Sequence, residues 1–215
     1  MYHFVDDKEF LKRLKYTCSG IINELVQLIN AEELLEVKAH LVGSGAKNLI
    51  TQNEKEPIDL DYNLCILKCY EIDINDCKSI KEYVRKSFNK VLKRNGWADC
   101  SDSKSALTTK YMAFKKGNKT SFSIDLCIIT EDEDKWWRLI HKKTGSFQTD
   151  EWIWNEGKNS SGLRDKVKWL KNNNLWNEVR DAYLKKKNLY LRRNDNTHPS
   201  FICYIEAVNE IYSKY

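Results

Sequence analysis

Proline is scarce in this chain, with 2 residues in 215, and its 8 glycines follow no collagen-like repeat. The hydrophobic share of 41% and the charged share of 31% are those of an ordinary globular protein, which excludes a collagenous or a low-complexity disordered chain. No run of about 18 apolar residues is present, so we expect no membrane span and no membrane partner. At this length we expect one compact domain, or a core of about 100 to 150 residues with a helical appendage.

Cysteine motifs with paired spacing are missing as well. The 7 cysteines are odd in number and scattered, which favours buried reduced thiols over a disulfide framework. No Cys-x-x-Cys pair and no nearby histidine completes a zinc set around Cys65, Cys69 and Cys77. The opening MYHFVDDKEF carries an acidic pair where a signal peptide would be basic and then apolar. We therefore expect a cytoplasmic protein.

The positive charge that is present is unevenly distributed. The formal net charge is only +5, from 36 basic and 31 acidic residues. Residues 135–193 hold 15 basic and 6 acidic residues, a net +9, which leaves −4 for the rest of the chain. Such a basic stretch favours an anionic partner such as a nucleoside triphosphate or an RNA backbone, although a solvated helical surface explains it equally well.

Hydrophobic periodicity predicts an alternation of helices and strands that ends in helices. The helices are expected over residues 10–29, 77–92, 163–171, 176–189 and 199–212. The strands are expected over residues 36–42, 58–66, 107–115 and 121–129, the last two joined by a hairpin turn. Residues around Trp152 and Trp154 are expected to form an aromatic and polar connection before the final helices.

Two aspartates stand at alternate positions of the strand predicted over residues 58–66. Side chains of a strand alternate between its faces, so Asp59 and Asp61 project from one face while Leu60 belongs to the other. Two carboxylates so close repel one another unless a cation lies between them, and magnesium prefers such oxygen ligands. An exposed strand face, on which the aspartates meet lysines or water, is the alternative.

A third acid interrupts an apolar strand pattern later in the chain. Asp125 lies between Ile124 and Leu126 in the strand predicted over residues 121–129. Pairing with a basic side chain and service as a further ligand of the same metal cluster explain this acid equally well.

A glycine turn stands between the first strand and a predicted short helix at Ala46. Backbone N–H groups at a helix start, together with the Ser44 hydroxyl, can bind an anion, and Gly43 and Gly45 allow a phosphate to approach the backbone. Neither the Walker pattern nor the Rossmann glycine fingerprint is present. Taken together with the acidic strand that follows, the turn indicates a site for a metal and a polyphosphate.

These residues resemble a known family. Leu41-Val42-Gly43-Ser44 followed by Ile58-Asp59-Leu60-Asp61 looks like the signature of the DNA polymerase beta-like nucleotidyltransferase superfamily, with Asp125 in the place of its third carboxylate. Val167-Lys168-Trp169-Leu170-Lys171 resembles the basic helix of the oligoadenylate synthetase, CCA-adding and bacterial cyclic-oligonucleotide synthase branch, and His198-Pro199-Ser200-Phe201 resembles the start of its later helix.

The resemblance implies an α+β fold, with a nucleotidyltransferase-type mixed β-sheet flanked by helices and a carboxy-terminal helical bundle. We expect residues 1–150 to form the nucleotidyltransferase core with its amino-terminal helix, and residues 151–215 to form the helical subdomain. The implied activity is transfer of a nucleoside monophosphate from a nucleoside triphosphate, with ATP as the expected donor, to an acceptor with release of pyrophosphate.

The resemblance also implies the roles of single residues. Asp59, Asp61 and Asp125 would hold two Mg²⁺ or Mn²⁺ ions, and Asp125 could draw the proton from an acceptor hydroxyl. The nucleotide would be bound by Gly43, Ser44, Lys47, Lys168 and Lys171. The acceptor stays open between a small molecule, a nucleotide and RNA, and a catalytically inactive nucleotide- or RNA-binding module of the same fold is the alternative function.

Overall fold

The computed structural model describes residues 1–132, 135–146, 148–157, 162–195 and 198–215. The chain divides into two units. The sheet unit comprises Asp7–Asn48 and Pro57–Gly157, and the helical unit comprises Met1–Asp6, Leu49–Glu56 and Lys158–Tyr215. The predicted division at residue 150 stays a prediction, since a grouping by spatial contact does not show that either part folds alone.

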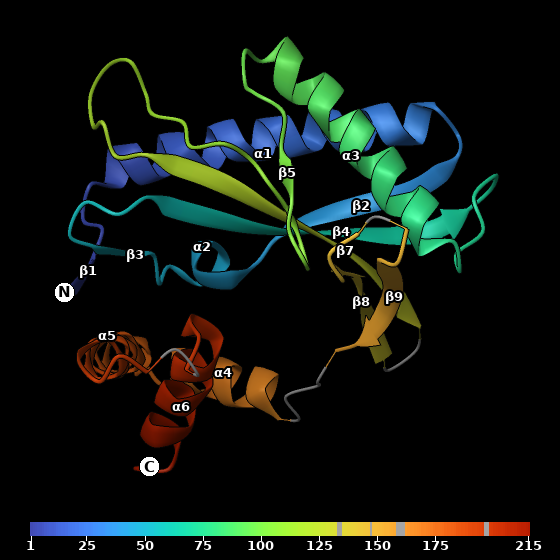
Figure 1. Cartoon of the computed structure of the whole chain (residues 1–215). Helices are drawn as coiled ribbons and strands as arrows, with labels where there is room; N and C mark the ends of the chain where they lie inside the picture. The colour runs from blue at the N-terminus through green and yellow to red at the C-terminus, as the bar shows by residue number, and fades with distance from the viewer. Residues whose placement is uncertain (133–134, 147, 158–161, 196–197) are drawn as a thin grey trace. The chain divides into compact units, whose positions relative to one another are not determined.

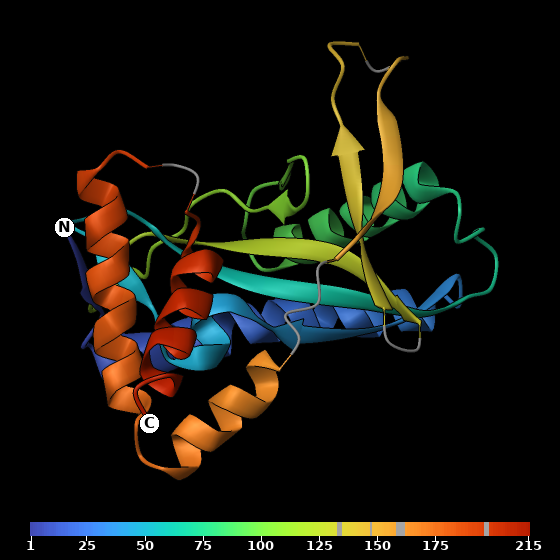
Figure 2. The ribbon, with the colours of Figure 1, turned by 90° about the horizontal axis from the view of Figure 1, so that it is seen from below.

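A mixed β-sheet forms the centre of the sheet unit (Figure 1). Its strands follow the order β2 (Leu35–Leu41), β4 (Ile58–Cys69), β7 (Phe122–Asp132), β6 (Leu107–Thr108) and β5 (Ser101–Asp102). Strands β4 and β7 are parallel, and their neighbours pair antiparallel. The far end of β7 pairs with β8 (Lys135–Lys142), which pairs with β9 (Glu151–Glu156) in a hairpin that projects from the sheet (Figure 2).

Two long helices, α1 (Lys8–Ala31) and α3 (Cys77–Arg94), cover one face of this sheet (Figure 1). Each begins at an aspartate whose side chain accepts a backbone N–H, Asp7 for α1 and Asp76 for α3. The Tyr62 hydroxyl of β4 lies 2.8 Å from Ser19 Oγ of α1, so the Tyr62 side of β4 faces the helices. The alternate residues of β4, which include both aspartates, therefore lie on the opposite face.

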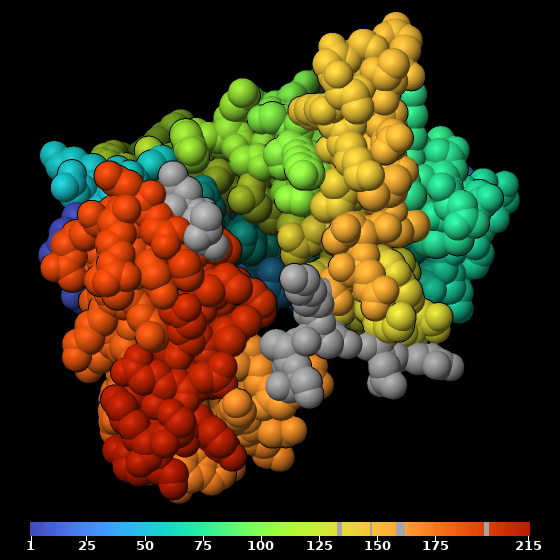
Figure 3. Space-filling view, turned by 60° about the horizontal axis from the view of Figure 1, so that its bottom comes forward, coloured from blue at the N-terminus to red at the C-terminus, as the bar shows by residue number. Residues whose placement is uncertain are grey.

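The helical unit joins α4 (Leu163–Asn172), α5 (Trp176–Arg192) and α6 (Ser200–Tyr212) to a two-stranded antiparallel sheet of β1 (Tyr2–Phe4) and β3 (Thr51–Asn53). Figure 3 shows the surfaces of α5 and α6 in contact. Their buried side chains form one apolar core that includes Leu170, Tyr183 and Val208. The Asn188 side chain ties β1 to α5, because its amide bonds both the N–H and the C=O of Tyr2.

The α+β class, the mixed sheet and the carboxy-terminal helices are confirmed, whereas two expectations for single strands are wrong. Of the strand predicted over residues 107–115, only Leu107–Thr108 forms. Pairing with β7 is interrupted at the exposed Lys110 and Tyr111, after which Met112 and Phe122 bond one another. The expected connection through Trp152 and Trp154 is strand β9. Within the described residues, no helix is long and apolar enough to cross a membrane.

Candidate active site

The parallel pairing of β4 and β7 brings the three predicted acids together. In the register of this pair, Asp61 lies opposite Asp125, and Asp59 lies opposite Ser123. Residues that are opposite one another in a ladder point to the same face, as do residues two apart on one strand. All three carboxylates therefore share the sheet face that α1 and α3 leave uncovered.

The carboxylates act on one another electrostatically. Burial, followed by the charges of Asp125 and Asp59, raises the pKa of Asp61 from 3.8 to about 6. Burial is also the largest cause of the raised pKa of Asp125, with the charge of Asp59 adding to it. Arg138 and Lys47 oppose the rise in the pKa of Asp61. The cluster thus holds more negative charge than its surroundings neutralise, which is the condition a divalent cation relieves.

Two hydroxyl groups hold the outer acids of the cluster. The Ser123 hydroxyl donates a hydrogen bond to Asp59 Oδ1 across the β4–β7 pair. The Thr108 hydroxyl of β6 donates to Asp125 Oδ1 at 2.6 Å. Neither hydroxyl was predicted from the sequence, although Ser123 lies two residues before Asp125 on the same face of a strand, a pattern that could have identified it.

The glycine turn lies directly against the middle acid. Gly43 has φ +60°, and a Cβ atom built on it would lie 2.2 Å from Asp61 Oδ2. The Val42 N–H donates to the Asp61 carbonyl at 2.8 Å. The short helix α2 (Gly43–Lys47) begins at Gly43 and not at Ala46 as expected, so the turn is itself the first part of the helix. The Gly43 backbone and the half-buried Ser44 are thereby placed beside the carboxylates.

The three predicted lysines belong to different units. Lys47 lies in the sheet unit, where its Nζ donates to the Gly43 carbonyl at 3.2 Å and its charge acts on Asp61. Lys168 and Lys171 lie on α4 in the helical unit, where Lys168 is exposed and the Lys171 ammonium lies 4.8 Å from the centre of the Trp176 ring. Contact of these two lysines with a nucleotide bound at the acids stays a prediction.

The side chains suit magnesium in chemistry but do not form a closed cage. In the described part of the chain, no three His, Cys, Asp or Glu side chains meet closely enough to hold an ion among them. Mg²⁺ does not require such a cage, because it keeps several waters and uses one or two carboxylates plus substrate phosphates. Because the Gly43 backbone approaches Asp61 closely, a phosphate bound at the turn would lie next to an ion bound by the carboxylates. The donor set therefore fits a magnesium–triphosphate complex.

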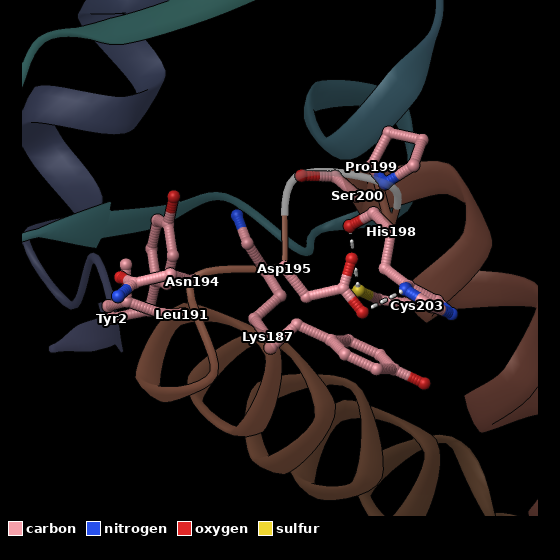
Figure 4. A pocket seen from close by; sticks show the side chains of 10 residues that line it. Tyr2, Lys187, Leu191, Asn194, Asp195, His198, Pro199, Ser200 and Cys203 are labelled. Carbon is pink, nitrogen blue, oxygen red and sulfur yellow. Dashed lines mark hydrogen bonds and ion pairs between the residues drawn. The ribbon is translucent and has the colours of Figure 1, made fainter.

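A separate concave feature belongs wholly to the helical unit. Figure 4 shows this cavity of about 250 Å³, with Lys187 extending into it from α5. The Lys187 ammonium donates to Thr51 Oγ1 at 2.9 Å and lies 3.8 Å from the centre of the Tyr2 ring, and burial lowers its pKa to about 8. His198 Nδ1 lies 2.7 Å from Asp195 Oδ2 in the same wall. The cavity offers no cluster of carboxylates, so the acids of the sheet unit remain the candidate active site.

Comparison with known proteins bears on the fold. No protein-family model and no curated protein matches this sequence. Solved structures do match. CdnC of E. coli MS115-1 with ATP has a TM-score of 0.59 and 13% sequence identity, over 94% of this chain and 61% of that chain. The CdnC:HORMA-deltaN complex of the same strain has a TM-score of 0.53 and 15% identity, over 95% and 58%.

This chain therefore spans about three fifths of the length of the CdnC chains that it matches. At such identities the likeness is one of fold alone, and it covers both the sheet unit and the helical unit, since nearly the whole of this chain is aligned. The fold of this chain is similar to that of the two CdnC structures.

Proposed function

We propose that this protein is a metal-dependent nucleotidyltransferase that moves a nucleoside monophosphate from a nucleoside triphosphate to an acceptor and releases pyrophosphate. The observation that carries the proposal is the in-register pairing of Asp61 with Asp125, with Asp59 on the same sheet face and the Gly43 backbone in contact with Asp61. Three acids and a phosphate-accessible turn are the groups that this chemistry requires.

The glycine turn and the basic side chains would bind the nucleotide. The backbone at Gly43 and the Ser44 hydroxyl would bind the outer phosphates, with Lys47 adjacent to the same turn. Lys168 and Lys171 would neutralise the pyrophosphate as it leaves, because the basic stretch that includes α4 is where the chain carries its positive charge. ATP is the donor to test first, since CdnC, which shares the fold, has been solved with ATP.

The acids would carry the chemistry of transfer. Asp59, Asp61 and Asp125 would hold two Mg²⁺ or Mn²⁺ ions, which when bound supply positive charge to the reacting phosphate and its leaving group. Asp125 would accept the proton of the acceptor hydroxyl at its Oδ2 oxygen, because Oδ1 already accepts a hydrogen bond from Thr108. Asp59 is kept in place by the Ser123 hydroxyl, so its exposed carboxylate faces solvent in a fixed orientation.

Substitution of the acids tests the proposal. We expect wild-type protein with ATP, Mg²⁺ or Mn²⁺ and a panel of nucleotide, RNA and small-molecule acceptors to release pyrophosphate. Asp59→Asn, Asp61→Asn and Asp125→Asn should each lower that rate by about a hundredfold or more, because the transition-state charge loses its support. Asp181→Asn, at an exposed position of α5, is the matched control and should leave the rate unchanged.

Two results would contradict the proposal. Full activity of Asp61→Asn in metal-replete buffer would remove the central acid from the site. Nucleotide binding by the wild type without turnover on any acceptor would support a catalytically inactive nucleotide- or RNA-binding module of the same fold.

A further inference from the structure

The hairpin of β5 and β6 is too short to be held by its own backbone pairing. Each strand has two residues, and the two pair only through Ser101 with Thr108 and Asp102 with Leu107. Thr108 nevertheless lies opposite Asp125 of β7, and its hydroxyl donates to Asp125 Oδ1 at 2.6 Å. A two-stranded pair is marginal in water by itself, so this hairpin depends on further contacts, among them the pairing of β6 with β7, where the Thr109 N–H donates to the Ile124 carbonyl at 3.0 Å.

A buried lysine supplies one of those contacts. Lys81 of α3 is 1% exposed, and its ammonium lies 2.6 Å from Asp102 Oδ1 on β5. The same ammonium donates to the Ser103 carbonyl at 2.9 Å, at the end of β5. A buried charge is retained only when it is paired and hydrogen-bonded, so removal of either partner would strongly destabilise this contact.

A histidine continues the chain of polar contacts to the β8–β9 hairpin. Within the sheet unit, His141 Nδ1 lies 2.7 Å from Asp102 Oδ2, and His141 Nε2 lies 2.8 Å from Asp150 Oδ2. The His141 ring stacks on Trp152 with 4.2 Å between ring centres. The backbone N–H of His141 also donates to the Lys104 carbonyl, in the β5–β6 turn, at 2.7 Å. Asp102 is thus held from α3 on one side and from β8 on the other.

The far end of this arrangement is the third carboxylate. Among the described residues, the Thr108 hydroxyl is the hydrogen-bond donor that reaches Asp125. Groups that bond the ligands of a metal fix their orientation, and their loss typically lowers metal affinity about 10- to 100-fold. Ile124 and Leu126, the neighbours of Asp125 along β7, project to the other face of the strand, and the hydrogen bond from Thr108 orients the carboxylate.

We propose that Thr108 is a positioning residue that fixes the Asp125 carboxylate for metal binding, and that the buried chain Lys81–Asp102–His141–Asp150 holds the hairpin that carries Thr108. This inference rests on the proposed function, because it assigns Asp125 to a metal site. The orientation of the Asp125 carboxylate would then depend on residues outside the proposed metal and nucleotide ligands.

Binding of Mn²⁺, followed by electron paramagnetic resonance in the presence of a non-hydrolysable ATP analogue, tests the role of Thr108. Thr108→Val keeps the shape of the side chain and removes the donor, and we expect it to weaken Mn²⁺ binding about tenfold. Thr108→Ser restores a hydroxyl and should stay within about twofold of the wild type. Thr130→Val, elsewhere on β7 and on its other face, is the matched control and should change nothing.

The buried chain is tested by a double substitution. When Thr108 is present, His141→Gln should weaken Mn²⁺ binding. In the Thr108→Val background it should weaken Mn²⁺ binding further by less than about twofold, because its effect passes through Thr108. Circular dichroism of each variant verifies the fold. If His141→Gln does not fold, Lys143→Gln replaces it. Lys143 is exposed, and its ammonium donates to the Asp102 carbonyl at 2.6 Å.

The outcomes separate the two proposals. Two results would overturn the positioning role, provided that Asp125→Asn still abolishes binding. One is wild-type Mn²⁺ affinity in Thr108→Val, and the other is an effect of His141→Gln that is as large without Thr108 as with it. Mn²⁺ binding that is unchanged in Asp125→Asn overturns the metal site itself, and with it both the proposed function and this inference.

Discussion

Asp61 lies at the centre of the acidic cluster, where the cost of keeping it ionised is highest. Its carboxylate meets the Gly43 backbone on one side and the charges of Asp59 and Asp125 on the other. A pKa raised to about 6 means that the folded protein binds a proton on Asp61 more tightly than the unfolded chain does. The acid is therefore retained at a cost in stability, as is common for groups with a functional role.

This shift predicts a stability gain on neutralisation. Between about pH 4 and pH 6 the unfolded state binds fewer protons at Asp61 than the folded state, so the wild type loses stability as the pH rises through that range. Asp61→Asn should therefore be more stable at pH 7, by about 1–3 kcal/mol, and no more stable at pH 3.5. Urea unfolding at the two pH values, in metal-free buffer, measures the difference.

Asp181→Asn, at its exposed position on α5, serves as the control and should show no such pH-dependent gain. A stability of Asp61→Asn that matches the wild type at both pH values would show that the carboxylate is not in the environment described here.

The approach of α2 to β4 is the element-scale feature on which the site depends. Gly43 begins α2 with φ +60°, and Gly45 packs so closely that a Cβ atom would lie 3.0 Å from Leu60 Cδ2. The first turn of the helix can therefore lie against the strand that carries the acids. A side chain at either position would push the helix away from the carboxylates.

Gly43→Ala, compared with a control glycine, distinguishes the strain of a positive φ from the contact with Asp61. Alanine at φ +60° costs about 1–2 kcal/mol wherever it occurs, and at Gly43 the added methyl also meets Asp61 Oδ2 at 2.2 Å. Gly117→Ala is the matched control, because Gly117 has φ +80° and no heavy atom within 4 Å of the added methyl. We expect Gly43→Ala to lose more stability than the control and to lose triphosphate binding, as measured by urea unfolding and by calorimetric titration. Equal losses for both variants would show that the Asp61 contact is unimportant.

The edge of β7 shows how much the elements depend on tertiary pairing. Its first half pairs with β6 at Leu126 and Asp125, and its far end pairs with β8 from Ile129 onward. The local sequence could not reveal this exchange of partners, since β6 has only two residues and β8 has no strict alternation. Long helices were easier to predict, because α1 and α3 repeat their buried positions over many turns.

At the scale of the whole molecule, charge is divided between the two units. The stretch of residues 135–193 with a net +9 includes α4 and α5 of the helical unit, whereas the acids lie in the sheet unit. A nucleoside triphosphate is an anion, so we expect the net positive charge of this stretch to attract it. Electrostatic attraction of this kind weakens as salt is added.

Removal of two of these positive charges should weaken nucleotide use. We expect Lys168→Gln/Lys171→Gln to raise the KM for ATP at low salt by about fivefold or more, because each lost contact of about 1 kcal/mol is a factor of about five. The KM of the variant should also depend less on salt than that of the wild type. Lys185→Gln, exposed on α5, is the control. A KM unchanged at low salt would exclude both lysines from the triphosphate site.

Several parts of this protein follow from local patterns in its sequence. Alternation along residues 58–66 put Asp59 and Asp61 on one face, and the glycines at 43 and 45 indicated a turn at which a phosphate could approach the backbone. The carboxy-terminal helices followed from a spacing of three to four residues.

The contacts of these residues depend on segments that are distant in sequence and meet in the folded protein. Ser123 and Asp59 are 64 residues apart in sequence, and parallel pairing of two strands, which no local period encodes, puts them in contact. The bond from Thr108 to Asp125 and the burial of His141 between Asp102 and Asp150 arise in the same way. The sequence around a polar residue does not indicate its hydrogen-bond partner, because the packing of apolar faces elsewhere in the fold determines which polar groups meet.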